Sequence, residues 1–413
     1  MGLKLRLSVM QFLQFFVWGA WLITVGGYCL NTKNWQPSEF GAIFATMGYA
    51  SLIMPALMGI VADRWMNSEK LYGLLHLLGA GMLFLVPSVG NPKDMFWIMM
   101  LNMLFYMPTI SLSIGISYSA LKEANLDIIK DYPPVRVWGT IGFIVAMWVV
   151  NLAGWKDSAV QFYVASAASL ALAIYALSLP KCPPLGSTVG VSWVDSLGLR
   201  SFRLFKDPSM ARFFIFAMLL GAALQLTNMY GSAFMGHFAS DPAHAEAFAV
   251  RNSSFILSIS QISEVLFILT IPFFMRRFGI RKVMFLSIIA WVLRFGLYAY
   301  GNPSDGLWMI VLSCVIYGMA FDFFNISGSI FVERQVEPSM RASGQGLFMM
   351  MSNGIGAVIG SQVSGIVIEK FFLVDGKMDW TGIWIAFAAY AAIIAVLFLA
   401  FFRKSSADQE ASA

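Results

Sequence analysis

Twelve apolar runs, each of about 18 residues or more, dominate the sequence and constrain its fold more than any other feature. A helix of about 20 apolar residues crosses the hydrocarbon core of a bilayer. Only 12% of the residues are charged, whereas about a quarter are charged in a soluble domain. The sequence therefore predicts an all-α polytopic membrane protein with twelve transmembrane helices. These spans lie near residues 8–30, 38–62, 71–90, 95–120, 136–154, 159–180, 209–235, 253–275, 282–300, 307–332, 342–369 and 380–402.

The runs fall into two sets of six, which a polar and basic segment separates. Two halves of equal helix number predict an internal repeat, a common design of membrane transporters. Two long runs contain Pro108 and Gly354, where a tilt or a break is expected. The predicted parts are an N-terminal six-helix bundle over 1–180, a cytoplasmic linker over 181–208, a C-terminal six-helix bundle over 209–402 and a cytoplasmic tail over 403–413.

Lysine and arginine residues between the runs predict the orientation of the chain, because cytoplasmic loops of membrane proteins are enriched in them. With the N-terminus inside, the outer loops hold far fewer basic residues than the inner ones, so both termini and the linker are predicted to be cytoplasmic. The formal net charge of +5 is spread over short clusters rather than one patch, and no nucleic acid is expected as a partner. The basic residues of the outer loops are Lys33, Lys93, Lys156, Arg251, Lys370 and Lys377.

Several function classes lack the residues they would need. Cys29, Cys182 and Cys314 are too few and too far apart for a disulfide framework or a metal site. The sequence shows no phosphate-binding glycine loop and no nucleophile elbow, so neither an enzyme nor an ATP-driven pump is predicted. His76 lies on an apolar run and is predicted to be a hydrogen-bonded core residue. No metal and no cofactor are expected.

The run 254–274 carries Gln261 and Glu264 near its middle. They are three residues apart and therefore share one face of a helix, close to Ser260 and Ser263. A carboxylate at this depth costs about 3 kcal/mol on insertion scales, so it normally faces the protein interior or a water-filled cavity. We predict that Glu264 faces a cavity. A structural alternative is an interhelical hydrogen bond or a pair with Arg294.

Polar side chains share a helical face in three other runs as well. Two carboxamides on one face can bind the edge of a polar, uncharged ligand. A carboxylate among aromatic rings has a proton affinity that desolvation can raise. Packing within the bundle, or an anchor at the membrane surface for the arginine, remains the structural alternative. The residues are Gln225 with Asn228, Asp322 with Asn325 between Phe321, Phe323 and Phe324, and Arg136 with Thr140 and Phe143.

Two basic turns occupy equivalent places in the two halves. One follows the second run and contains Asp63 and Arg64, and the other follows the eighth run and contains Arg276 and Arg277. Together with twelve spans, these turns resemble the cytoplasmic loop signature of the major facilitator superfamily, in which an Asp-Arg pair latches the inner gate. The first turn departs from that signature, with Asn67 and Ser68 where a glycine and a basic residue are usual. These four residues are therefore gating candidates, with topology alone as the alternative.

Longer segments give a closer resemblance, to the bacterial nucleoside:proton symporter family of that superfamily. The segments are FLQFFVWGAWL, MPALMGIVADRW, PPVRVWGTIGFI, LGAALQLTNMYG, SISQISEVLFILTIPFF and YGMAFDFFNISGSIFVE. The resemblance covers nearly the whole chain and is weakest in the linker and the last dozen residues. It implies proton-coupled uptake of nucleosides such as uridine and adenosine across the bacterial inner membrane, by alternating access. It also implies that the proton is the coupling ion and that the lipid bilayer is the surrounding partner. A monomer is expected.

The resemblance also implies which residues form the site. Glu264 and Asp322 are expected to contact ribose hydroxyls or to carry the coupled proton. Three alternatives stay open: a proton-coupled sugar or oligosaccharide symporter of the same fold, a drug efflux antiporter, and a membrane enzyme or receptor without flux. The implied substrate positions are Arg136, Thr140, Phe143, Gln225, Asn228, Gln261, Glu264, Phe321 and Asp322.

Overall fold

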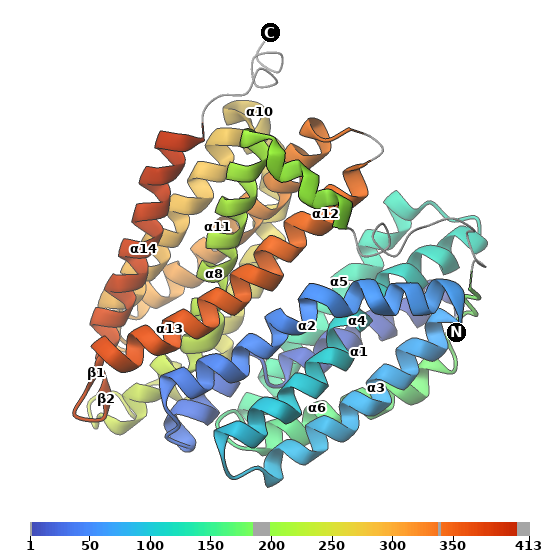
Figure 1. The fold of residues 1–413 in the computed structure, drawn as a ribbon. Helices are drawn as coiled ribbons and strands as arrows, with labels where there is room; N and C mark the ends of the chain where they lie inside the picture. The colour runs from blue at the N-terminus through green and yellow to red at the C-terminus, as the bar shows by residue number, and fades with distance from the viewer. Residues whose placement is uncertain (1, 185–198, 338–339, 403–413) are drawn as a thin grey trace. The chain divides into compact units, whose positions relative to one another are not determined.

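A computed structural model of the chain describes residues 2–184, 199–337 and 340–402, and it is almost entirely helical (Figure 1). The described chain divides into two compact units. One comprises 1–35 and 42–197, and the other comprises 36–41 and 198–413, as far as each is described. Much of the predicted linker, 185–198, and the whole predicted tail, 403–413, lie outside the described residues.

The first unit is built from apolar helices joined by short turns. Its longest helix, α4, runs without interruption past Pro108, so the expected break at this proline is absent. The helical elements are α1 (Leu3–Gly19), the π-helical η1 (Gly27–Thr32), α2 (Pro37–Arg64), α3 (Ser68–Leu85), the 3₁₀ turn η2 (Val86–Ser88), α4 (Pro92–Glu123), α5 (Ile128–Leu152) and α6 (Val160–Ala176).

The second unit is also helical, with one two-stranded hairpin. The hairpin turns at Asp375 and Gly376, both with positive φ, as the Asp-Gly sequence favours. Its elements are η3 (Leu199–Lys206), α8 (Pro208–His237), η4 (Phe238–Ser240), α9 (Phe248–Arg251), α10 (Ser253–Tyr300), α11 (Leu307–Gln335), α12 (Arg341–Met349), η6 (Met350–Gly356), α13 (Ala357–Phe371), β1 (Leu373–Val374), β2 (Lys377–Met378) and α14 (Trp380–Phe401).

Local sequence explains where several helices begin. Asn91 and Asp207 precede Pro92 and Pro208, and each side chain accepts a hydrogen bond from a backbone N–H in the first turn of α4 or α8. Asp379 caps α14 in the same way, by accepting from the Gly382 N–H at 3.0 Å. Caps of this kind satisfy amide groups that the helix itself leaves unpaired, and proline fits the first helical position.

The helix α10 is two helices in one continuous segment, because Gly279 has φ 75° and ψ 164° and interrupts the helical backbone. Only glycine adopts this conformation without strain. Among the described residues, nine helices are long and apolar enough to cross a membrane when α10 counts as one. Division at Gly279 adds a tenth, and α6 and the α1–η1 segment complete the twelve predicted spans.

A π-helical turn in the eleventh span and an earlier start of the fifth span also bear on the predictions. At Gly354, where a tilt or a break is expected, the backbone forms the π-helical η6, which joins α12 and α13 into one continuous rod (Figure 1). The fifth span begins at Ile128 rather than at the predicted 136, and Pro133 and Pro134 lie inside it. Both prolines are accommodated in the second turn of α5. Arg136 therefore lies within the helix and not at its first residue.

Candidate substrate and proton site

The polar face of α10 packs against α11 in the second unit. Ser260 and Ser263 are buried, and Gln261 and Glu264 are half-buried. The Ser263 hydroxyl donates to the Val315 carbonyl and accepts from the Gly318 N–H at 3.3 Å. A Cβ at Gly318 would lie 2.6 Å from the Ser263 carbonyl carbon, so only glycine permits this approach. The two helices are therefore in close contact beside the predicted carboxylates.

Asp322 lies on α11 with 3% of its surface exposed, and its charge interacts with that of Glu264. The two carboxylates are therefore electrostatic neighbours, and their joint role in proton coupling stays a prediction. Two carboxylates at close range repel each other when both are ionised, and a proton bound by either one relieves that repulsion. The pair can therefore hold a proton as a unit.

Three of the predicted substrate positions present buried oxygen atoms whose hydrogen-bonding capacity is unused. Gln225 Oε1, Gln261 Oε1 and Asp322 Oδ2 are buried and have no hydrogen-bond partner within the described part of the chain. Buried polar atoms in folded proteins nearly always have a partner, so each such atom calls for an explanation. All three belong to the second unit and can accept hydrogen bonds, which suits a ligand rich in O–H and N–H donors.

Aromatic and amide side chains line a pocket in the second unit. Phe321 is stacked on Tyr317, with ring centroids 6.0 Å apart and planes 9° apart. The half-buried Asn325 and Asn353 contribute carboxamides to this otherwise mostly apolar lining. The pocket is lined by Ala217, Leu220, Gly221, Leu224, Trp291, Ala320, Phe321, Phe324, Asn325, Phe348, Ser352 and Asn353.

The predicted residues of the fifth span lie along the contact between α5 and α1 in the first unit. The Arg136 guanidinium carbon lies 4.2 Å from the centre of the Phe15 ring. Phe143 is buried and meets the edge of Trp18, with ring centroids 6.5 Å apart. Thr140 is half-buried between these two contacts along α5. Arg136 thus interacts with an aromatic ring, in a geometry that sequence spacing did not predict.

A buried hydrogen-bond network in the first unit explains His76. Its Nε2 lies 2.9 Å from Gln14 Oε1, and its Nδ1 lies 3.1 Å from Ser169 Oγ. Gln14 also accepts from the Tyr72 hydroxyl and donates to Thr109. The prediction of a hydrogen-bonded core histidine is confirmed, because every partner is an internal side chain that joins α1, α3, α4 and α6.

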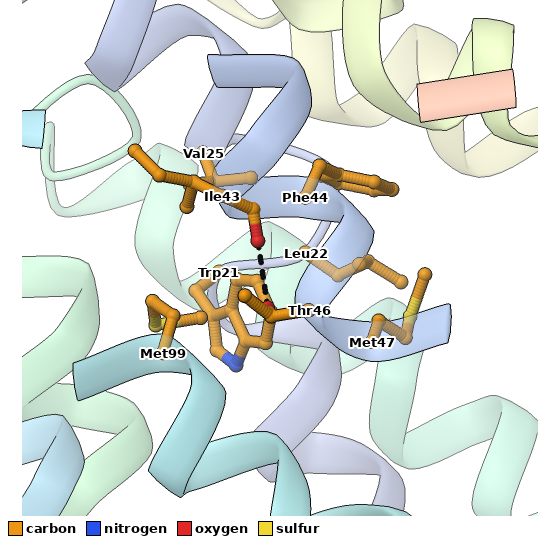
Figure 2. Close-up of a pocket in the computed structure, with 8 residues that line it drawn as sticks. All are labelled: Trp21, Leu22, Val25, Ile43, Phe44, Thr46, Met47 and Met99. Carbon is orange, nitrogen blue, oxygen red and sulfur yellow. Dashed lines mark hydrogen bonds between the residues drawn. The ribbon is translucent and has the colours of Figure 1, made fainter. Parts of the chain in front are cut away.

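A second pocket, in the first unit, contains none of the predicted site residues (Figure 2). Its only hydroxyl belongs to Thr46 and donates to the Ile43 carbonyl at 2.6 Å. With the Thr46 hydroxyl already bonded and the rest of the lining apolar except for the Trp21 indole, this pocket offers a polar ligand little to bind. It is lined by Trp21, Leu22, Val25, Ile43, Phe44, Thr46, Met47 and Met99.

The gating candidates lie at helix ends in both units. Asp63 is exposed and Arg64 is half-buried in the last turn of α2. Arg276 and Arg277 are exposed just before the Gly279 kink, and the Arg276 Nε–H donates to the Pro272 carbonyl at 3.2 Å. These positions suit surface residues of a turn, and their role in a gate stays a prediction.

Glu69, which sequence reasoning did not single out, anchors the first of these turns. It is buried, accepts from the Cys182 N–H at 2.8 Å and accepts from the Asn67 amide at 2.9 Å. Asn67, one of the two departures from the superfamily signature, therefore has a structural role. Glu69 was not predicted from the sequence because its partner, the Cys182 N–H, is a backbone group more than a hundred residues away.

Comparison with known proteins identifies the family. A family model described as nucleoside H+ symporter matches residues 1–407. The chain belongs to this family. Xanthosine permease of Escherichia coli strain K12 is 52% identical over 404 residues, which are 98% of this chain and 96% of that protein. Nucleoside permease NupG of the same strain is 49% identical with the same coverage.

Solved structures agree with this membership. The crystal structure of nucleoside transporter NupG matches with a TM-score of 0.93 and covers 98% of this chain and 100% of that chain. A POT family transporter solved with 5-aminolevulinic acid matches with a TM-score of 0.71 at 13% identity, over 99% and 96% of the two chains, which shows a shared fold alone. The predicted all-α fold of the major facilitator type is confirmed. Members of the nucleoside H+ symporter family are transporters, as predicted, and not enzymes.

Proposed function

We propose that this protein takes up nucleosides together with protons across the bacterial inner membrane, by alternating access. The family membership supports the substrate class and the coupling ion. The observation that carries the proposal is the set of unused buried oxygen atoms on Gln225, Gln261 and Asp322. Ribose hydroxyls and base N–H groups are the donors that such acceptors would bind.

We propose two groups of residues for the binding of a nucleoside. Phe321 and Phe143 pack on the flat faces of base and ribose, since aromatic rings bury much area at low entropic cost. Gln225, Asn228 and Gln261 accept and donate along the polar edges. Arg136 and Thr140 contribute further polar contacts from the first unit.

The coupled proton is assigned to the carboxylate pair Glu264 and Asp322. A proton on this pair removes a negative charge that would otherwise have to be exposed to a low dielectric during the transport cycle. Protonation and nucleoside binding can then favour the same conformational transition, which couples the two fluxes. No other cofactor is required by this scheme.

The decisive experiment is uptake by proteoliposomes that contain the purified protein and an imposed inward proton gradient. Labelled uridine should accumulate above its external concentration, and a protonophore should abolish the accumulation. Unlabelled adenosine, inosine and xanthosine should be offered as competitors beside maltose. Competition by a nucleoside but not by the disaccharide is expected. Competition by maltose alone would support the sugar symporter instead.

We propose that both termini and the linker 181–208 are cytoplasmic, that the bundles extend over 1–180 and 209–402 with a tail over 403–413, and that the protein works as a monomer. Asp63 and Arg64 in the first half and Arg276 and Arg277 in the second are proposed to act in the inner gate. The distribution of basic residues supports the orientation. Labelling of single cysteines placed at Lys93 and at Arg281 from the two sides of the membrane tests it.

A further inference from the structure

Trp18 is an aromatic residue of α1 that the proposed site does not include. Its ring centroid lies 6.5 Å from that of Phe143, with the planes at 84°, so the edge of one ring meets the face of the other. It lies 6.4 Å from the Phe15 ring, over which the Arg136 guanidinium is placed. Trp18 therefore neighbours Phe143 directly and Arg136 through Phe15, and both Phe143 and Arg136 are proposed to bind the nucleoside.

Glycines bring the backbones of α1 and α5 together next to Trp18 and Phe143. A Cβ at Gly19 would lie 2.8 Å from the Phe143 Cα, and a Cβ at Gly142 would lie 2.8 Å from the Phe12 carbonyl carbon. Neither position has room for a side chain, so both need glycine. Gly19 follows Trp18 and Gly142 precedes Phe143 in the sequence. Backbone contacts therefore determine how Trp18 and Phe143 lie relative to each other.

The indole nitrogen of Trp18 is a buried donor without an acceptor. Its Nε1 has no hydrogen-bond partner in the described part of the chain, although the side chain as a whole is only half-buried. The Tyr106 ring lies beside it, with centroids 5.6 Å apart, but the Tyr106 hydroxyl donates to the Gln14 carbonyl at 2.8 Å. A buried indole N–H normally has a partner. An acceptor on a ligand would supply one.

Trp384 is the one other tryptophan among the described residues whose buried Nε1 lacks a partner. It is fully buried in the second unit and stacks on Phe295 and Tyr298, with ring centroids 6.2 and 4.7 Å apart. No residue of the proposed site is among the rings that contact it. Trp18 differs in both respects, because its side chain is half-buried and its ring meets Phe143. A ligand can therefore approach Trp18 but not Trp384.

The chemistry of the other unused atoms indicates what Trp18 would bind. The unpartnered oxygens of Gln225, Gln261 and Asp322 accept hydrogen bonds, and therefore suit the O–H and N–H groups of a nucleoside. The carbonyl oxygens of a nucleobase can only accept, so these three oxygens cannot satisfy them. An indole N–H is a donor only. Trp18 thus offers the kind of bond that a base carbonyl requires.

We propose that Trp18 is a further substrate-binding residue, whose indole N–H donates to a carbonyl oxygen of the nucleobase. This inference rests on the proposed function for its substrate and extends the site to α1. A tryptophan that only packs between α1, α4 and α5 would use its ring and not its N–H.

The first test removes the N–H and keeps an aromatic ring. The dissociation constant of the purified protein for uridine is measured by isothermal titration. In W18F it should rise about 3- to 10-fold, the loss expected for one neutral hydrogen bond. W384F is the matched control, because it removes the other unpartnered indole N–H far from the proposed site residues, and its affinity for uridine should equal that of the wild type. A folded W18F protein with wild-type affinity would overturn the proposal.

The second test asks which group of the ligand accepts the bond. In 2-thiouridine and 4-thiouridine, sulfur replaces one carbonyl oxygen and is a weaker acceptor. The wild type should bind one of the two analogues more weakly than uridine, whereas W18F should bind that analogue and uridine equally. Such a cycle isolates the interaction between the indole and the replaced oxygen. If both analogues lower the affinity of W18F as much as that of the wild type, the indole does not donate to a base carbonyl.

A third test needs no variant and decides if W18F does not fold. Hydroxyl radicals oxidise accessible tryptophan rings, and mass spectrometry locates the oxidation in the wild-type protein. Uridine should protect Trp18, while the exposed Trp97 is the control and should be oxidised equally with and without uridine. Uridine binding that leaves the oxidation of Trp18 unchanged would refute the role of Trp18 alone. A wild type that binds no nucleoside would instead refute the proposed function.

Discussion

Replacement of Gln225 by leucine tests whether the amide of this residue binds the nucleoside or only stabilises the fold. Gln225 is 3% exposed, and its Oε1 has no partner among the described residues. If that oxygen accepts from the nucleoside, Q225L leaves a buried donor of the ligand unsatisfied, which costs about 1–3 kcal/mol. The dissociation constant for uridine should therefore rise by about 5- to 150-fold.

The same substitution should not destabilise the empty protein. Leucine has nearly the volume of glutamine and removes a buried acceptor that lacks a partner, a change that is often neutral or stabilising. The thermal unfolding temperature of Q225L without nucleoside should stay at or above that of the wild type. Binding is measured by isothermal titration with uridine, and unfolding by a thermal shift in the same detergent.

Gln14 supplies the matched control, since it is also buried but its amide oxygen and nitrogen both have hydrogen-bond partners. Q14L would deprive the Tyr72 hydroxyl and the His76 ring of their shared acceptor. Each buried group that loses its partner costs about 1–3 kcal/mol, so Q14L should lower the unfolding temperature clearly. Equal destabilisation by Q225L and Q14L, with uridine affinity unchanged in Q225L, would refute the assignment of Gln225 to the substrate.

Three further predictions address proton coupling, helix packing and the reactivity of a buried thiol. D322N should abolish uphill uridine accumulation in proteoliposomes yet retain uridine exchange, and accumulation at the wild-type level would remove Asp322 from the coupling step. G318V should lower the unfolding temperature, because its side chain meets the Ser263 backbone, and G115V, at a glycine with open space, is its control. Burial raises the pKa of the Cys182 thiol, so only a small fraction of it is thiolate at pH 7. Labelling of Cys182 by a maleimide should therefore be slow at pH 7 and become faster as the pH rises. Rapid labelling of Cys182 at pH 7 would contradict its burial.

Helix positions were largely predictable because apolar length and capping residues are local properties. The seventh span, predicted over 209–235, is Pro208–His237 in the structure, with Asp207 and Pro208 at its start. The predicted start of the fifth span was wrong because the apolar run begins near 136, whereas the helix also includes the more polar residues before it, from Ile128.

The candidate site was predictable in part. Helical spacing alone grouped Gln261 with Glu264 and Gln225 with Asn228, because residues three apart share a face. The relation between Glu264 and Asp322 depends on how α10 packs against α11, which the Ser263–Gly318 approach determines. The spacing of residues within one helix contains no information about this contact between α10 and α11.

The neighbours of the site were not predictable, because they depend on long-range contacts. Arg294 was considered only as a partner for Glu264, whereas the structure places its guanidinium over Tyr317 and Tyr298. His76 was predicted to be bonded, but its partners Gln14 and Ser169 come from other helices. A buried polar residue in an apolar run predicts that a partner exists and does not say which one.

The most direct measurement of the central claim records protons and nucleoside together. Proteoliposomes are suspended in weakly buffered medium with a pH-sensitive dye outside, and uridine is added without an imposed gradient. Our account predicts that uridine makes the medium more alkaline, that inosine or adenosine does so as well, and that D322N does not respond. Uridine entry without any change in external pH would contradict proton-coupled uptake.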